Sequence, residues 1–244
     1  MSAVAAPLCD PSSPSYPKWT TFDLLAWKVW PERWRGGTQY LFAYKDGWVA
    51  YNRLRIVAAA GQAGIPADLL AGVAWEEVGG DPDFTDMPKV RIREFDWSGP
   101  DFVDRHLTIT KPPEDTSLGS ISIQLRAAAH ELGLNPETLD HQRRTNLAQC
   151  LETDAFNIEV VARHLRRLVA HDYPHANPMA LTDEQFAIAG SRYNRGTRRA
   201  LGDYEASFRA APGSPGREYT EYGRAMLRRR ARVAGLLRPT APKP

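Results

Sequence analysis

The 244-residue sequence has few cysteines, little net charge and no long apolar run. Its two cysteines, Cys9 and Cys150, are too few for a small fold held by many disulfides, so we expect two free thiols. A net charge of +2 is too small to indicate nucleic-acid binding, which needs a strongly basic face. No segment approaches the roughly 20 apolar residues that cross a bilayer, so no stable membrane insertion is expected.

The composition is that of an ordinary globular protein, with 43% hydrophobic and 25% charged residues. Apolar residues recur at helical spacing in several segments. These segments are 52–64, 65–80, 121–132, 154–171, 183–190 and 219–237. Residues 83–116 are charged and contain short alternating pieces, which predict a small strand region or a long loop. The sequence therefore predicts a mainly α (α+β) fold with a small β or loop insert.

Residues 19–48 contain five of the seven tryptophans. Such rings could form a sugar-stacking surface, but indoles usually serve to bury area, and we expect the second role. The predicted organisation is a flexible lead at 1–18, a Trp-rich segment at 19–50 packed on the main domain, a main domain at 51–238 and a tail at 239–244.

Two adjacent carboxylates, Glu76 and Glu77, stand where the helix predicted at 65–80 ends in Gly79-Gly80. At about 100° per residue they fall on opposite flanks of the apolar face, so periodicity does not choose between them. A carboxyl against apolar neighbours has a raised pKa, as a general acid at neutral pH requires. Alternatively both are solvated charges, although acidic groups sit badly with the dipole at a helix C-terminus.

Five segments in order, spanning roughly residues 52–235, resemble the soluble lytic transglycosylases and goose-type lysozymes of the lysozyme-like superfamily. They are AGQAGIPADLLAGVAWEEVGGDP, SLGSISIQLRAAAHELG, FNIEVVARHL, AGSRYNRG and REYTEYG. In the first signature of this family, a helix ends in the catalytic glutamate and a proline follows five residues later. Glu77 stands five residues before Pro82 and matches that glutamate.

The resemblance implies a role for each matching residue. Tyr219 falls on the tyrosine that faces the catalytic glutamate. The remaining implied substrate-binding residues are Ser122 and Gln124 in the substrate strand and Tyr193 and Asn194 in the Tyr-Asn-x-Gly motif.

The chain also departs from the family pattern at five positions. Val78 replaces a serine, Ser122 a glutamine and Val161 a helix glycine. Arg192 and Arg195 replace alanines around Tyr193, which predicts a more cationic cleft.

The resemblance implies a muramidase that cleaves the β-1,4 bond between MurNAc and GlcNAc in peptidoglycan. Glu77 would protonate the leaving oxygen as general acid. The same residue could then act as base while the sugar closes an anhydro ring. In the hydrolytic route a second carboxylate activates water, for which Asp115 is preferred and Glu114 is the alternative. Either acid could equally be a turn or N-cap residue.

No cofactor or metal is expected. His171 and His175 are four residues apart, but Pro174 interrupts any helix between them. The AHELG segment lacks the second histidine of the H-E-x-x-H zinc pattern.

The start of the chain does not resemble a signal peptide, which predicts synthesis in the cytoplasm although the implied substrate lies outside it. This conflict predicts an antibacterial effector delivered to the periplasm of a target cell by a type VI-like secretion system, or a phage lysis enzyme. An effector would have a secretion-system component and a cognate immunity protein as partners. The alternatives are a catalytically inactive glycan-binding or interaction module, and a nucleic-acid binder that uses the arginine-rich end.

Overall fold

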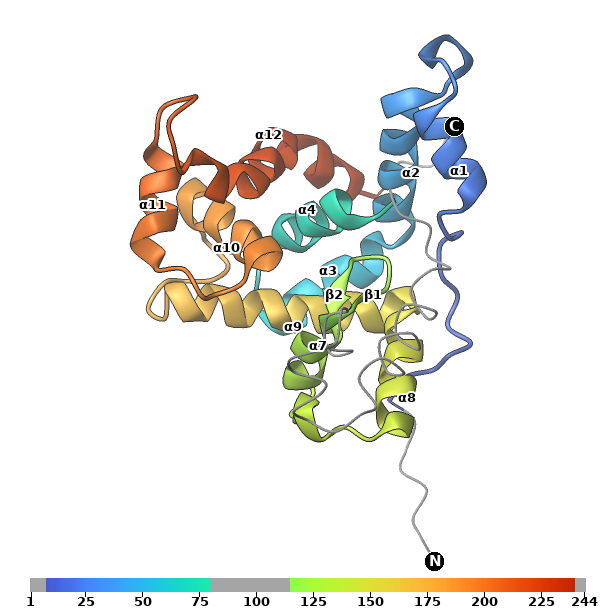
Figure 1. Ribbon diagram of the computed structural model, residues 1–244, viewed down its shortest axis with the longest axis horizontal. Helices are drawn as coiled ribbons and strands as arrows, with labels where there is room; N and C mark the ends of the chain where they lie inside the picture. The colour runs from blue at the N-terminus through green and yellow to red at the C-terminus, as the bar shows by residue number, and fades with distance from the viewer. Residues whose placement is uncertain (1–7, 80–114, 240–244) are drawn as a thin grey trace, which may run out of the picture. The chain divides into compact units, whose positions relative to one another are not determined.

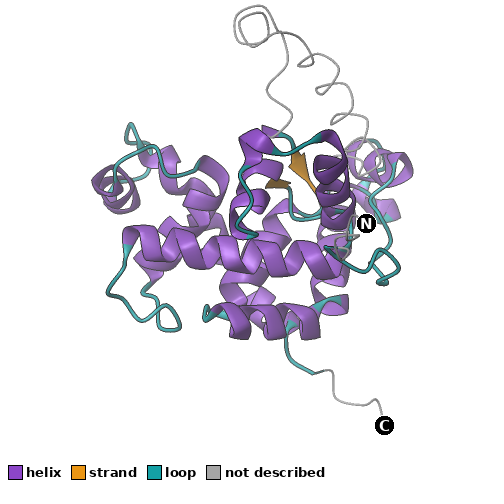
Figure 2. Cartoon of the chain, turned by 90° about the horizontal axis from the view of Figure 1, so that it is seen from below, coloured by secondary structure: helices purple, strands orange, loops and turns teal. Residues whose placement is uncertain are grey.

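Figure 1 shows the computed structural model of the chain, of which residues 8–79 and 115–239 are described. Within these ranges the protein is mainly helical, with one short two-stranded sheet (Figure 2). The α-helices are α1 (Thr21–Lys28), α2 (Gly37–Tyr51), α3 (Arg53–Ala63), α4 (Ala67–Glu77), α7 (Leu125–Glu131), α8 (His141–Leu151), α9 (Asp154–Asp172), α10 (Asp183–Arg195), α11 (Leu201–Arg209) and α12 (Glu221–Leu236). The mainly α prediction is confirmed. Most of the predicted strand region at 83–116 lies outside the described residues.

The contacts divide the chain into two compact units, and each is described by itself. Unit 1 comprises residues 1–42 and 79–160, and unit 2 comprises residues 43–78 and 161–244. The boundaries predicted from composition, at residues 18, 50 and 238, stay a prediction.

Helix α4 lies within the segment predicted at 65–80 and is shorter at both ends. Pro66 is its N-cap, one residue before the helix, and Val78 leaves the helix in an extended conformation. Gly79 follows with a φ of 75°, a left-handed conformation that glycine adopts without steric cost. The helix therefore ends at Glu77, with both neighbouring glutamates in its last turn.

In unit 2, helices α4, α10 and α12 meet at small residues. A Cβ on Gly223 of α12 would lie 1.8 Å from the carbonyl oxygen of Ala187 in α10. Met226, one turn further along α12, lies against Gly72 of α4 and Gly190 of α10. At Gly223 a side chain would prevent this approach because it would meet backbone, whereas at Gly72 and Gly190 it would meet the side chain of Met226. The close contact at Gly223 fixes the start of α12 against α10.

In unit 1, β1 (Ser117–Leu118) and β2 (Ile123–Gln124) form an antiparallel hairpin with Ser117 opposite Gln124. We call residues 117–124 the hairpin. The helix predicted at 121–132 starts too early in the sequence, because residues 123–124 pair with β1 and α7 begins only at Leu125.

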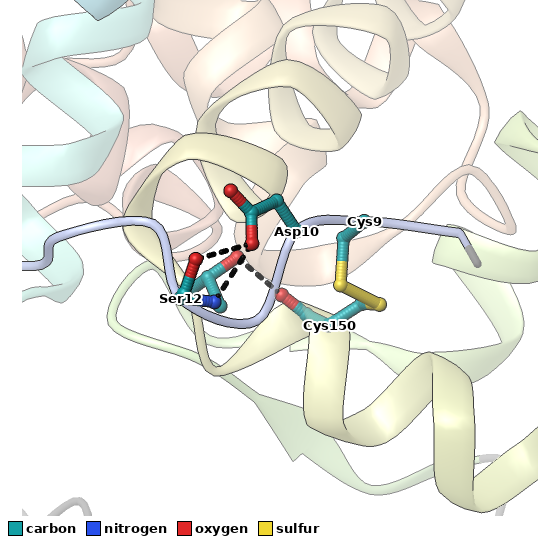
Figure 3. The surroundings of a disulfide bond; sticks show 5 residues. Cys9, Asp10, Ser12 and Cys150 are labelled. Carbon is teal, nitrogen blue, oxygen red and sulfur yellow. Dashed lines mark hydrogen bonds between the residues drawn. A yellow bond between two sulfur atoms is a disulfide. The ribbon is translucent and has the colours of Figure 1, made fainter.

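The expectation of two free thiols is wrong, because Cys9 and Cys150 form a disulfide (Figure 3). Their Cα atoms are 5.6 Å apart although 141 positions separate them in the sequence. The bond ties residues 8–18, which we call the strap, to the end of α8. No local pattern signals this pairing, because it depends on a tertiary contact between distant segments.

The tryptophans of the Trp-rich segment differ in exposure. Trp19 in unit 1 and Trp48 in unit 2 are each only 1% exposed, as the packing interpretation predicts. Trp30 and Trp34 in unit 1 are 43% and 65% exposed, and a sugar-stacking role for these rings stays a prediction.

Candidate active site

The carboxyl group of Glu77 lies at the end of α4, half-buried in unit 2. The hydroxyl of Tyr222, from the start of α12, donates a hydrogen bond of 2.7 Å to Glu77 Oε1. Burial raises the pKa of Glu77, while the Tyr222 bond and the charge of Lys45 oppose the rise. Glu77 therefore retains its proton to a higher pH than an exposed glutamate does.

Glu76 has a different partner. Its Oε1 accepts a 2.7 Å hydrogen bond from Nη1 of Arg229 in α12, within an ion pair. Burial raises the pKa of Glu76, and the charge of Arg229 is the strongest influence against that rise. A carboxylate held by a guanidinium is a poorer proton donor than one held by a hydroxyl. The structure thus separates two glutamates that helical periodicity leaves equivalent.

Lys45 of α2 contacts the C-terminal end of α4. Its ammonium group is buried and donates hydrogen bonds of 2.8 Å to the carbonyl oxygens of Trp75 and Glu76. Burial lowers the pKa of Lys45 to about 8. A cation at a helix C-terminus interacts favourably with the helix dipole, which offsets the cost of two acidic residues in the last turn. Nothing in the local sequence marks Lys45 for this position.

Tyr193 of α10 is also influenced by the charge of Glu77. Its half-buried ring packs edge-on against His164, with the ring centres 5.8 Å apart. Burial raises the pKa of Tyr193 well above its usual value, and the negative charge of Glu77 adds to the effect. Tyr193 and Tyr222 also influence each other electrostatically. The negative charge of Glu77 therefore raises the pKa of both tyrosines.

The tyrosine that faces Glu77 is Tyr222, so the assignment of this position to Tyr219 is wrong. The Tyr219 ring instead lies beneath Arg195 and Arg199, whose guanidinium carbons are 5.8 and 3.8 Å from its centre. The REYTEYG segment contains both tyrosines, three residues apart, so the segment alone does not choose between them. A substrate-binding role for Tyr219 stays a prediction.

The expectation that Arg192 makes a cleft more cationic is also wrong. Arg192 is 1% exposed, and its Nε and Nη2 atoms donate to the two carboxylate oxygens of Asp172 at 2.7 and 2.8 Å. The positive charge of Arg192 is thus neutralised by a buried ion pair with Asp172. Arg195 and Asn194, at the end of α10, are exposed.

The remaining predicted site residues lie in unit 1. Asp115 is ion-paired with Arg126, and Glu114 lies outside the described residues. Ser122 is half-buried with a φ of 47°, an uncommon conformation for a residue with a side chain, and Gln124 is exposed. Because these residues belong to unit 1 and Glu77 belongs to unit 2, their assignment to one site stays a prediction.

Comparison with known proteins assigns no family to this chain. No protein-family model, curated protein or solved structure matches it. The roles proposed below therefore depend on the geometry around Glu77 and on the five short segments that resemble the lysozyme-like superfamily.

The described residues also show no metal centre and no membrane span. Within residues 8–79 and 115–239, no group of three or more His, Cys, Asp or Glu side chains could hold a metal ion. No helix in these ranges is long and apolar enough to cross a bilayer. The Nδ1 atom of His171 lies 2.9 Å from Asp172 Oδ1, the carboxylate that also pairs with Arg192.

Proposed function

We propose that this chain is a lysozyme-like muramidase in which Glu77 is the general acid. The observation that carries the proposal is the half-buried Glu77 carboxyl, whose pKa is raised by burial and whose Oε1 is held by the Tyr222 hydroxyl. A glycosidic bond breaks only when its leaving oxygen receives a proton, so the enzyme needs a carboxyl that is still protonated near neutral pH. Among the five segments, AGQAGIPADLLAGVAWEEVGGDP is the one that aligns the catalytic glutamate with this residue.

Glu77 can supply that proton in a reaction with two alternative endings. In lytic transglycosylation the resulting Glu77 carboxylate takes a proton from a sugar hydroxyl, which closes an anhydro ring. In hydrolysis a second carboxylate activates water. Asp115 is the described candidate for the second role, and its ion pair with Arg126 would have to be part of that site. Lytic transglycosylation requires only the Glu77 carboxyl at the end of α4.

The Cys9–Cys150 disulfide supports a place of action outside a reducing cytoplasm. Disulfides persist in oxidising compartments such as the bacterial periplasm and are rare in the cytosol. The peptidoglycan that the proposal assigns as substrate lies in that compartment.

The test is the release of fragments from purified peptidoglycan by wild type, Glu77→Gln and Glu76→Gln. Removing a general acid lowers the rate by about 10²–10⁴-fold, so Glu77→Gln should release almost nothing. Glu76→Gln makes the same chemical change one residue earlier, in the carboxylate held by Arg229, and should retain most activity. Circular dichroism and thermal unfolding verify that both variants fold.

Mass spectrometry of the fragments distinguishes the two endings, because anhydro sugars report transglycosylation and reducing sugars report hydrolysis. If neither wild type nor Glu77→Gln releases product, the protein is a non-catalytic module and the proposal is wrong. If both release the same amount, Glu77 is not the general acid and the proposal is also wrong. An equal loss in both glutamate variants would contradict the assignment of the acid to Glu77 alone.

A further inference from the structure

The segment that joins α8 to α9, residues 150–157, holds the strap through two carboxylates as well as through the disulfide. The backbone N–H of Tyr16 donates to Asp154 Oδ2 at 2.7 Å. The ammonium of Lys18 donates to Glu152 Oε2 at 2.9 Å. We call residues 150–157 the junction. Asp154 is only 1% exposed, so its carboxylate depends on protein donors.

The same two carboxylates also hold the hairpin. Glu152 Oε1 accepts from the backbone N–H of Gly119 at 3.4 Å, and Asp154 Oδ1 accepts from the Ser120 hydroxyl at 3.2 Å. Each carboxylate therefore uses one oxygen for the strap and the other for the hairpin. If the strap moves away, the carboxylates of Glu152 and Asp154 lose donors while they remain close to the hairpin. A carboxylate that has lost a donor is costly, so these side chains would rearrange to reach other donors.

The turn of the hairpin lies directly on the junction. The Ile121 backbone N–H donates to Oδ1 of the fully buried Asn157 at 2.9 Å. A Cβ on Gly119 would lie 2.2 Å from the carbonyl oxygen of Leu151, so only glycine fits there. The conformation of residues 119–122 is thus set by contacts with the junction as well as by the two short strands.

We propose that the Cys9–Cys150 disulfide is a redox-dependent lock on the hairpin, with Glu152 and Asp154 as the positioning residues that transmit its state. With the disulfide intact, the strap is fixed at the junction and both carboxylates are fully paired. With the thiols reduced, the strap loses its covalent attachment and keeps its non-covalent contacts, which include the Lys18 ion pair at its far end. The hairpin then loses order.

The functional consequence rests on the proposed muramidase activity. The hairpin carries Ser122 and Gln124, the residues expected to bind the glycan. A protein made in a reducing cytoplasm would hold this segment loosely, and it would order the segment once oxidised outside. The lock would thus tie substrate binding to the compartment in which the substrate lies.

The chemistry of the lock is thiol–disulfide exchange. A dithiol such as dithiothreitol supplies two electrons and two protons to the S–S bond. The products are two cysteine thiols and the cyclic disulfide of the reagent. Oxidation by a disulfide compound reverses these changes.

Hydrogen–deuterium exchange tests the lock without any need for catalysis. Exchange is compared in oxidised wild type, wild type reduced with dithiothreitol, and the Cys9→Ser/Cys150→Ser double variant. We expect amides of residues 117–124 to exchange at least tenfold faster in the reduced and variant proteins, while amides of α10 and α12 in unit 2 are unchanged. Unchanged hairpin exchange, or equal acceleration throughout the chain, would overturn the proposal.

Asp10→Ala is a matched control within the strap. Asp10 accepts hydrogen bonds from Ser12 beside the disulfide and makes none of the junction contacts described above (Figure 3). Its loss should leave hairpin exchange as in oxidised wild type. Faster hairpin exchange in this variant would show that any damage to the strap suffices, against a specific role for the disulfide.

Fragment release from peptidoglycan gives a second, separable measurement. If oxidation lowers the KM for glycan with little change in kcat, the lock acts through substrate binding as proposed. If exchange responds to reduction but no form cleaves glycan, the lock stands and the muramidase proposal fails. If the protein is active but its hairpin exchange does not respond to reduction, the lock fails and the muramidase proposal stands.

Discussion

Replacing Tyr222 with phenylalanine tests whether Glu77 is tuned as the structure indicates. The change removes the 2.7 Å hydrogen bond to Glu77 Oε1 and keeps the ring. A hydrogen bond to a charged group contributes about 1.5–3 kcal/mol, which corresponds to a roughly ten- to hundredfold change in the ratio of carboxylate to carboxylic acid at a given pH. This bond favours the carboxylate, so its loss raises the pKa of Glu77 further.

For the proposed muramidase, the expected result is a displacement of the pH–rate profile for glycan cleavage. A general acid is lost as the pH rises through its pKa, so the basic limb of the Tyr222→Phe profile should move to higher pH. A carbon-13 NMR titration of the Glu77 carboxyl should move in the same direction and does not require turnover. Tyr219→Phe is the matched control, because its ring lies beneath Arg195 and Arg199. An unmoved or lowered basic limb, or an equal displacement in Tyr219→Phe, would refute the role of Tyr222.

Three further predictions concern stability. Burial raises the pKa of Glu77, so the unfolded chain releases this proton at a lower pH than the folded chain does. The free energy of unfolding therefore falls as the pH rises from the pKa of the unfolded state to that of the folded state. Glu77→Gln should therefore raise Tm at pH 7–8 but not at pH 4. The rise should be about 2–4 °C for each kcal/mol gained in the free energy of unfolding. A lower Tm at pH 7–8 would contradict the raised pKa. Gly223→Ala places a methyl 1.8 Å from the Ala187 carbonyl oxygen and should cost about 3 kcal/mol in urea unfolding, whereas a neutral result would mean that α12 can shift freely. Arg192→Met leaves the buried Asp172 carboxylate without its guanidinium and should cost about 3–5 kcal/mol by calorimetry; a loss below about 1 kcal/mol would show that the pair is dispensable.

The helices that could be predicted from the sequence are those with a clear apolar period or with helix-ending residues beside them in the sequence. Helix α4 has an apolar face, a proline before it and glycines after it, and α9 has a sustained apolar period. By contrast α8 (HQRRTNLAQCL) is too polar to show a clear period, and its existence depends on the N-cap Asp140 and on packing. Helices α1 and α2 lie in a segment where tryptophans obscure the pattern.

The candidate site could be predicted only as far as its local motif. The AWEEVGG segment has two glutamates at a helix end, and only the resemblance, through the spacing to Pro82, selects Glu77. The physical difference between the two carboxyls comes from Tyr222 and Arg229, about 150 residues away in the sequence. Lys45 reaches the same helix end from α2, again without a local signal. Partners that are distant along the chain meet only through packing, and periodicity carries no information about them.

The glycine contacts between α4, α10 and α12 would influence any mutational survey of this protein. Tyr222 immediately precedes Gly223, so a side chain at that glycine would move the hydroxyl away from the α4 terminus by displacing the whole helix. A side chain at Gly190 would instead displace the side chain of Met226 in α12. Positions that never meet a ligand would then score as essential, and only a measurement of folded protein beside each activity would separate them from residues that take part in chemistry.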